Sequence, residues 1–218
     1  MIGQLRPNYV HYLNLYNKTL EQRNNYLKQI IKENKPEEML EIWDEKLAEY
    51  GEKIYEYRNE FIEKLKEKIE KIHSEITENK ENIKIEYISN CETEEIYRNL
   101  LKERRKLDII KGFTTKGSHR DDFNIYINNN LVNIYGSQGQ NRTTVLSLKI
   151  AEMQVIYDEI GENPILLLDD FMSELDEERR NNFIKYIKDS QVIITCTDKI
   201  NNINKNYKEF KVVNGKIL

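Results

Sequence analysis

A run of apolar residues at alternating steps of three and four constrains the fold more than any other sequence feature. Its members are Leu40, Trp43, Leu47, Tyr50, Ile54, Tyr57 and Phe61. Similar steps continue to Ile76. This spacing places the apolar residues on one stripe of an α-helix. At about 1.5 Å per residue such a helix would be roughly 60 Å long, and its apolar stripe requires a partner.

The preceding residues supply that partner. A second helical pattern over residues 8–32 carries apolar residues at similar steps, with Arg23 where another apolar residue is due. Pro36 separates the two patterns, because proline is tolerated in the first turn of a helix but not in its interior. We expect an antiparallel, coiled-coil-like hairpin, to which a third helix over 93–110 returns. The alternating residues 83–87 predict a short strand before that third helix.

The pattern changes after Lys111. We expect a hairpin over 123–134, helices over 142–160 and 178–188, buried strands over 165–168 and 191–195, and a closing hairpin over 210–218. On the first of these helices, the residues predicted to face inward are Val145, Leu148, Ala151 and Val155. Continuous apolar strands are typical of a parallel sheet covered on both faces. The sequence therefore predicts an all-α arm with a short strand over 1–111, and an α/β lobe over 112–218.

The charge balance limits what the chain can bind. Basic residues number 34 and acidic residues 38, which gives a formal net charge of −4. A contact with DNA would therefore have to be a local basic patch. The charge-rich arm is either a helical spacer with solvated faces or a specific binding surface. The chain has no apolar run of transmembrane length and no apolar signal-peptide core, so we expect a cytoplasmic protein.

Two carboxylates mark the first candidate site. Asp169 and Asp170 follow the apolar run Leu166-Leu167-Leu168. The carboxyl end of a buried parallel strand is where α/β sheets bind ligands. One carboxylate there can hold Mg²⁺ and the next can orient or deprotonate a water, as phosphoryl transfer requires. The alternative is that the pair ends a strand and caps a turn.

Glycines and polar residues mark three further candidates. Gly136-Ser137-Gln138-Gly139-Gln140 precedes a predicted helix, so its backbone N–H groups and the helix N-terminus could meet a phosphate. Many strand-to-helix turns are glycine-rich, so a simple turn is the alternative. Ser173-Glu174-Leu175-Asp176 could face a partner subunit or cap the next helix. Thr195-Cys196-Thr197-Asp198 emerges from the second buried strand.

Taken in order, these four features resemble the second lobe of an ABC-type ATPase head. Residues 136–143 and 166–176 are similar to the signature and Walker B stretches of the RecF family. Residues 117–122 are also similar, although RecF proteins usually have proline in place of Ser118. The arm agrees in Leu20-Glu21-Gln22-Arg23-Asn24 and in residues 42–47. The resemblance covers nearly the whole chain. Residues 136–140 are called the signature loop below.

The resemblance does not extend to a Walker A loop. Residues 112–118 have the glycine spacing of such a loop, but the lysine after the second glycine is absent and no helix follows. We interpret 112–118 as a connection between arm and lobe. The resemblance thus implies that the chain corresponds to the carboxyl-terminal part of a RecF protein. Alone, it is then expected to bind no cofactor and to hydrolyse no ATP.

The family's site residues carry over as follows. Asp169 would act on Mg²⁺, and Asp170 would be the candidate catalytic base. Thr197 stands where many ABC-type heads have a histidine, which puts a histidine-based sensor of the γ-phosphate in doubt.

The resemblance assigns the remaining residues to a dimer interface. Ser137, Gly139 and Gln140 would contact the γ-phosphate of ATP bound to the opposite subunit. Asp176 would belong to a loop that crosses between the subunits.

The resemblance also implies a biological role. In RecF proteins, ATP and Mg²⁺ close a homodimer on DNA, and the protein works with RecR and RecO to load RecA at single-stranded gaps. The alternative is a non-enzymatic protein-interaction module built on the helical hairpin.

Overall fold

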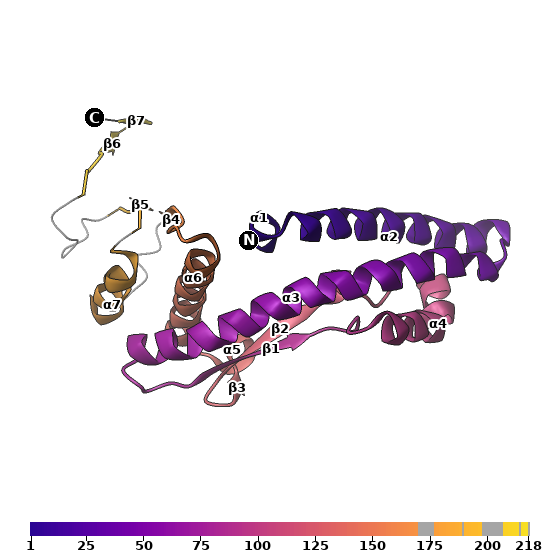
Figure 1. Ribbon diagram of the computed structural model, residues 1–218, viewed down its shortest axis with the longest axis horizontal. Helices are drawn as coiled ribbons and strands as arrows, with labels where there is room; N and C mark the ends of the chain where they lie inside the picture. Colours follow the sequence, from indigo (N-terminus) through magenta and orange to yellow (C-terminus); the bar gives the residue numbers. More distant parts are fainter. Residues whose placement is uncertain (170–176, 189, 198–206, 214, 218) are drawn as a thin grey trace.

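Helix α3 (Leu40–Ile76) forms the long axis of the molecule, as Figure 1 shows. The computed structural model describes residues 1–169, 177–188, 190–197, 207–213 and 215–217. Helix α2 (Pro7–Glu33) runs antiparallel to α3, and α4 (Glu94–Lys111) packs against the same end of this pair. A single short turn, α1 (Ile2–Leu5), precedes α2. The predicted helical hairpin is confirmed.

Local sequence signals set the ends of the arm helices. Pro7 occupies the first turn of α2, and Asn34 ends that helix in the left-handed conformation at φ 51°. A short 3₁₀ turn (Glu37–Met39) then leads into α3. The Thr93 hydroxyl accepts a hydrogen bond from the Ile96 N–H at the start of α4, and Gly112 ends α4 at φ 70°. The predicted helix bounds are correct to within a few residues.

The first sheet joins residues on both sides of the predicted boundary at 111. Strand β1 (Ile83–Ile88) pairs antiparallel with β2 (Asp122–Ile127), with Ile83 opposite Ile127. Strand β2 also pairs with β3 (Asn130–Leu131). The predicted division into arm and lobe stays a prediction, and the names arm (1–111) and lobe (112–218) are kept for convenience.

The predicted hairpin over 123–134 is only partly correct. Asn128 and Asn129 have φ values of 49° and 66°, which two-residue hairpin turns require. The second strand nevertheless ends at Leu131, and α5 (Val132–Tyr135) follows as one helical turn. Ile134 is 65% exposed, so the apolar alternation after the turn does not correspond to a buried face.

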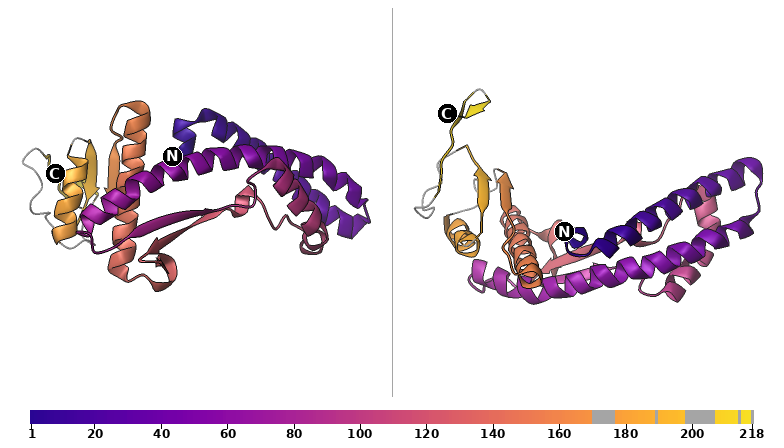
Figure 2. Two further views of the ribbon diagram at one scale, coloured as in Figure 1. Left: turned by 60° about the horizontal axis from the view of Figure 1, so that its bottom comes forward. Right: turned by 45° about the horizontal axis from the view of Figure 1, so that its top comes forward.

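The lobe is built around a pair of parallel strands. Strand β4 (Leu166–Asp169) pairs with β5 (Val192–Thr195), which confirms the predicted parallel strands. Helices α6 (Gln138–Ile160) and α7 (Glu177–Ile187) pack with these strands against the carboxyl-terminal half of α3. Strands β6 (Val212–Val213) and β7 (Lys216–Ile217) form the predicted closing hairpin. Figure 2 shows α6, α7, β4 and β5 gathered at one end of α3.

The expectation that this sheet is covered on both faces is wrong for the described residues. Leu168 is buried against α6 and α7, whereas Leu167 and Ile193 are 70% and 54% exposed. The described helices pack on one face only, and alternate side chains of a strand point to opposite faces. The other face is therefore apolar and open.

The predicted inward face of α6 also needs correction. Val145 is 47% exposed, while Leu146, Ile150 and Met153 are buried beside the predicted Ala151 and Val155. Helix α6 contacts both α3 and α7, so its buried face is wider than a single stripe. Within the described residues, none of the long helices is apolar enough to span a bilayer.

Candidate functional site

The signature loop forms the first turn of α6. The Ser137 hydroxyl accepts a hydrogen bond from the Gln140 N–H at 3.2 Å, and the Gln140 side-chain oxygen accepts one from the Ser137 N–H at 3.0 Å. This reciprocal pair is a capping box, which starts the helix at Gln138 rather than at the predicted Arg142. Ser137 is exposed at the helix N-terminus, where backbone N–H groups favour an anion.

Arg179 of α7 lies against this turn. A Cβ atom on Gly139 would be 3.0 Å from Arg179 Nη1, so the missing side chain gives the guanidinium room beside the helix N-terminus. The helix dipole and the guanidinium both favour a negative charge here. Arg179 was not predicted, because an arginine in a charge-rich helix carries no signal of its own.

Asp169, from the predicted carboxylate pair, lies at the carboxyl end of β4. It is exposed and pairs in register with Thr195 of β5, whose hydroxyl donates a hydrogen bond to Asp169 Oδ1. An exposed carboxylate beside a hydroxyl oxygen fits the hard oxygen ligands that Mg²⁺ prefers. Thr197 is exposed two residues beyond the end of β5. Asp170 and Asp176, like the rest of 173–176, lie outside the described residues.

The described residues therefore place the predicted site residues in two groups. Ser137, Gly139 and Gln140 lie together at the start of α6, and Asp169 and Thr197 lie at the ends of the parallel strands. Among the described residues, no set of three or more acidic, histidine or cysteine side chains is arranged to hold a metal ion. The roles assigned to both groups stay predictions.

A chain of hydrogen bonds connects the signature loop to the arm. Gln140 Nε2 donates to Glu81 Oε1 at 3.1 Å, and His73 Nε2 lies 3.2 Å from Glu81 Oε2. His73 Nδ1 lies 2.9 Å from the Ser147 hydroxyl. Burial lowers the pKa of His73, and the Glu81 carboxylate opposes that shift. A neutral imidazole can donate from Nε2 to Glu81 and accept from Ser147 at Nδ1.

Comparison with known proteins finds relatives described as RecF. RecF of Clostridium perfringens, described as a DNA replication and repair protein, is 46% identical over 223 residues, which cover 99% of this chain and 61% of the relative. RecF of Halothermothrix orenii is 44% identical over 231 residues, which cover 99% of this chain and 62% of the relative. The chain is homologous to RecF. It spans about 60% of the length of these curated relatives.

Solved structures agree with this assignment. A structure described as the recombination mediator protein RecF with ATP, in the RecFOR pathway, matches with a TM-score of 0.84 and 38% identity. The match covers 99% of this chain and 59% of that chain. A second RecF structure from the same pathway matches with a TM-score of 0.82. No protein-family model matches the chain.

The arm of this RecF homologue contains a buried ionic network. Arg23 is fully buried; its Nε donates to Asp44 at 2.7 Å and its Nη1 donates to Asp108 at 2.8 Å. Arg105 donates to the other oxygen of Asp44, so two cations balance two carboxylates. The sequence signal was Arg23 itself, the one polar residue on an apolar stripe.

The segment interpreted as a connection, 112–118, is part of this network. Arg23 Nη1 donates to the buried Thr114 hydroxyl at 2.8 Å. The Thr115 N–H and hydroxyl both donate to Asp108 Oδ1. The network thus joins α2, α3, α4 and the segment after α4. It is distant in sequence from the signature loop, and its role is to hold the arm together.

Next to it, a histidine is enclosed by the arm. His119 Nε2 lies 3.1 Å from the Thr114 carbonyl, so this nitrogen donates and Nδ1 accepts from the Tyr16 hydroxyl at 2.9 Å. Burial lowers the pKa of His119 and raises that of Tyr16. The backbone at Gly117 lies so close to two tyrosines that a Cβ on Gly117 would overlap the hydroxyls of Tyr97 and Tyr16. Gly117 also has φ 137°, which other residues rarely adopt.

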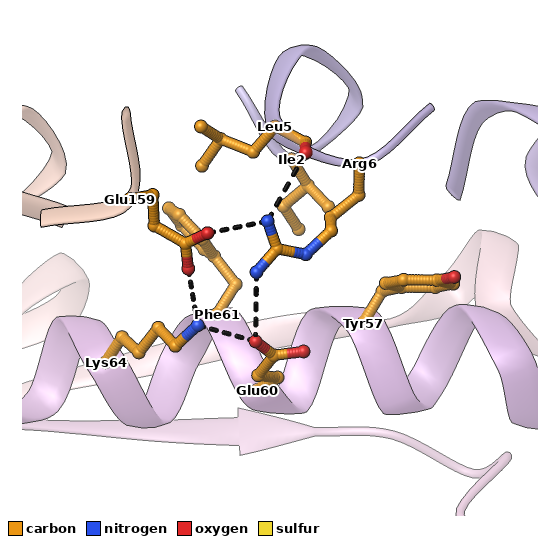
Figure 3. A pocket seen from close by; sticks show the side chains of 8 residues that line it. All are labelled: Ile2, Leu5, Arg6, Tyr57, Glu60, Phe61, Lys64 and Glu159. Carbon is orange, nitrogen blue, oxygen red and sulfur yellow. Dashed lines mark hydrogen bonds and ion pairs between the residues drawn. The ribbon is translucent and has the colours of Figure 1, made fainter. Parts of the chain in front are cut away.

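A four-charge cluster lines a small pocket between α1, α3 and α6, as Figure 3 shows. Arg6 pairs with Glu159 at 2.6 Å and with Glu60 at 3.3 Å, and Lys64 pairs with both carboxylates. Each carboxylate therefore meets two cations. The hydrogen bonds lower the pKa values of Glu60 and Glu159. Because the charges neutralise one another, the cluster holds α3, α6 and the start of α2 together and is not a ligand site.

Proposed function

We propose that this chain is the part of a RecF-type repair ATPase that presents its signature loop to ATP held by a second subunit. The observation that carries the proposal is the exposed, capped N-terminus of α6, with Arg179 beside Gly139. In this capped loop the Ser137 hydroxyl would donate its hydrogen to the γ-phosphate, and the Gly139 backbone N–H would add a second donor. The Gln140 N–H holds the Ser137 oxygen, so Gln140 would act by keeping Ser137 in place. The homology and the match to a RecF structure described with ATP support this role.

Asp169 would hold Mg²⁺, and Asp170 would orient or deprotonate the attacking water. When bound, Mg²⁺ would neutralise charge on the phosphates. The Thr195 hydroxyl orients the Asp169 carboxylate at the strand end, where it would meet the ion. Thr197 would face the same edge without supplying the proton chemistry of a histidine.

The open face of β4 and β5 supports a larger ATPase head. Leu167 and Ile193 expose apolar surface that a parallel sheet normally buries. In the proposal, this face is covered by the part of the relatives that the chain does not span. Because that part would contribute the phosphate-binding lysine, the chain alone would not hydrolyse ATP.

The pathway follows from the relatives' descriptions and the resemblance together. We infer that the complete protein binds DNA at single-stranded gaps and works with RecR and RecO to load RecA. Because this chain has a formal net charge of −4, any DNA contact that it makes would be local rather than spread over its surface.

The test is Ser137→Arg in a longer protein that joins this chain to the part that its relatives have in addition. A bulky cation at Ser137 should obstruct the partner subunit and remove the hydroxyl donor. Sedimentation with a slowly hydrolysed ATP analogue should show loss of dimerisation, while nucleotide titration of the monomer stays unchanged. Asn17→Arg, which adds a cation on the exposed side of α2, is the matched control. Normal dimerisation of Ser137→Arg would refute the role in the opposite subunit.

One observation favours the alternative, a protein-interaction module. Ile31, Met39 and Ile42 are 57%, 43% and 56% exposed around the end of the helical hairpin. Such apolar side chains can bind a partner. Replacing Ile42 with glutamate should abolish partner binding if this end is the functional surface, and should leave ATP-driven dimerisation intact.

A further inference from the structure

Four side-chain pairs link helix α6 to the arm. They are Lys64–Glu159, Lys68–Asp158, His73–Ser147 and Glu81–Gln140. The apolar residues between them are buried in one core with α3. Packed helices that are also joined by ion pairs and hydrogen bonds resist sliding past each other. We therefore expect α3 and α6 to move together.

The pair Glu81–Gln140 differs from the others because it reaches the signature loop. Glu81 is positioned where the chain turns back after α3, and its carboxylate contacts both His73 and Gln140. Its side chain is only 16% exposed. The Gln140 amide that donates to Glu81 belongs to the side chain that accepts from the Ser137 N–H. Glu81 thus fixes the rotamer on which the capping box depends.

The charge of Glu81 excludes a direct role in holding phosphate. A carboxylate repels an anion, so its location next to a proposed phosphate site would be a cost if it acted on the nucleotide. Its two hydrogen-bond partners are a helix residue of the arm and a residue of the loop. This arrangement is that of a group that orients another side chain.

We propose that Glu81 is a positioning residue for the signature loop. Through Glu81, the arm helix α3 sets the geometry that the loop presents to ATP. The proposal rests on the proposed function of the loop. A change in the direction of α3 would move His73 and Glu81, and with them the Gln140 side chain. The loop would then lose its capped conformation without any substitution in the loop itself.

Three variants of the chain separate positioning from simple stability. Glu81→Ala removes the acceptor for Gln140 and His73. Glu81→Gln keeps an oxygen for Gln140, and its amide can donate to His73 if the imidazole takes its other tautomer. Glu63→Ala removes a carboxylate of the same charge from the exposed side of α3, where it pairs with Lys66.

The first measurement is hydrogen exchange of the amides of residues 137–142 in the 218-residue chain. Glu81→Ala should exchange about tenfold faster there, as expected for loss of a charge-assisted hydrogen bond, with little change at Trp43. Glu81→Gln should stay close to the original chain, and Glu63→Ala should be unchanged. Equal exchange in all variants would overturn the proposal, as would a uniform increase across the chain with Glu81→Ala.

The second measurement uses the longer protein of the Ser137→Arg test. Glu81→Ala should weaken association driven by the ATP analogue about tenfold, and Glu81→Gln should restore it. Unchanged association with Glu81→Ala, where Ser137→Arg abolishes it, would overturn the positioning role alone. If Ser137→Arg also associates normally, the proposed function of the loop fails, whereas the exchange result still decides whether Glu81 positions it.

Discussion

Within the described residues, the arm buries charged side chains beside its apolar core, and the lobe does not. Arg23, Asp44 and Asp108 are fully buried, and both carboxylates accept hydrogen bonds from Arg23. The lobe has an apolar core around Leu168 and Phe183, and the adjacent Leu167 is exposed. The arm is thus complete within the described residues, whereas one face of the lobe sheet is open.

This difference indicates what fixes the arrangement of the elements in each region. Buried ion pairs contribute little net stability, but each charge must meet its partner, so they select one arrangement of helices. An exposed apolar face, in contrast, is stabilised by any apolar segment that covers it, so it does not select one arrangement. We infer that the buried network holds the arm helices in a single geometry, while the lobe requires a covering segment to bury Leu167 and Ile193.

The largest expected effect comes from breaking the arm network. Arg23→Ala would leave Asp44 and Asp108 buried with less compensation, which typically costs about 3–5 kcal/mol. Trp43 is the only tryptophan and lies in the arm, so its fluorescence during urea unfolding reports on this region.

An exposed ion pair provides the control. Lys53 pairs with Glu56 on the surface of α3 at 2.9 Å, and Lys53→Ala should cost at most about 0.5 kcal/mol. Similar losses for Arg23→Ala and Lys53→Ala would mean that the buried network does not stabilise the arm.

The next effect contrasts two adjacent residues of β4. Leu168→Ala opens a cavity in the lobe core and should cost about 2–5 kcal/mol. Leu167→Gln replaces an exposed side chain and should change stability by no more than about 0.5 kcal/mol. Circular dichroism during thermal unfolding measures both.

The variants Leu167→Gln and Leu168→Ala also test whether the outer face of β4 is open in solution. Leu167→Gln should also reduce self-association at high concentration, because it removes exposed apolar area. A loss of stability as large as that of Leu168→Ala would show that Leu167 is packed in solution, and the contrast between arm and lobe would be wrong.

The regular elements were predictable because their physical causes are local. The step of three and four defined α3, and the two apolar runs defined the parallel strands β4 and β5. The exposed face of those strands was not predictable, because a strand pattern does not say which elements will cover it. The start of α6 could have been found, since Ser137 and Gln140 have the spacing of a capping box.

The candidate site was predictable only as motifs. The sequence indicated Ser137, Gly139 and Asp169, but the residues that contact the loop are far away in sequence. Arg179 lies 40 positions after Gly139, and Glu81 lies 59 positions before Gln140. Such pairs depend on how α3, α6 and α7 pack, which no local pattern specifies. His73 also gave no signal, since a histidine on an apolar stripe is usually a core residue.

The smallest expected effect comes from protonating His119, which packs against the arm. Burial lowers the pKa of His119 below its ordinary value of about 6.5, so the folded protein favours the neutral imidazole. Between the folded and unfolded pKa values the unfolded chain binds more protons, so stability rises with pH there. The contribution is complete above about pH 6.5 and is lost as pH falls through the folded pKa, with each unit of difference worth about 1.4 kcal/mol.

Unfolding followed by Trp43 fluorescence at about pH 7.5 and about pH 5.5 measures this loss. His119→Gln should flatten the dependence, because the group that titrates is removed. His11→Gln, at an exposed position of α2, should leave it unchanged. His73 is also buried with a lowered pKa, so part of the dependence should persist in His119→Gln. Equal slopes for the original chain and His119→Gln would mean that His119 protonates as readily in the folded arm as in the unfolded chain, contrary to its enclosure by Tyr16 and Thr114.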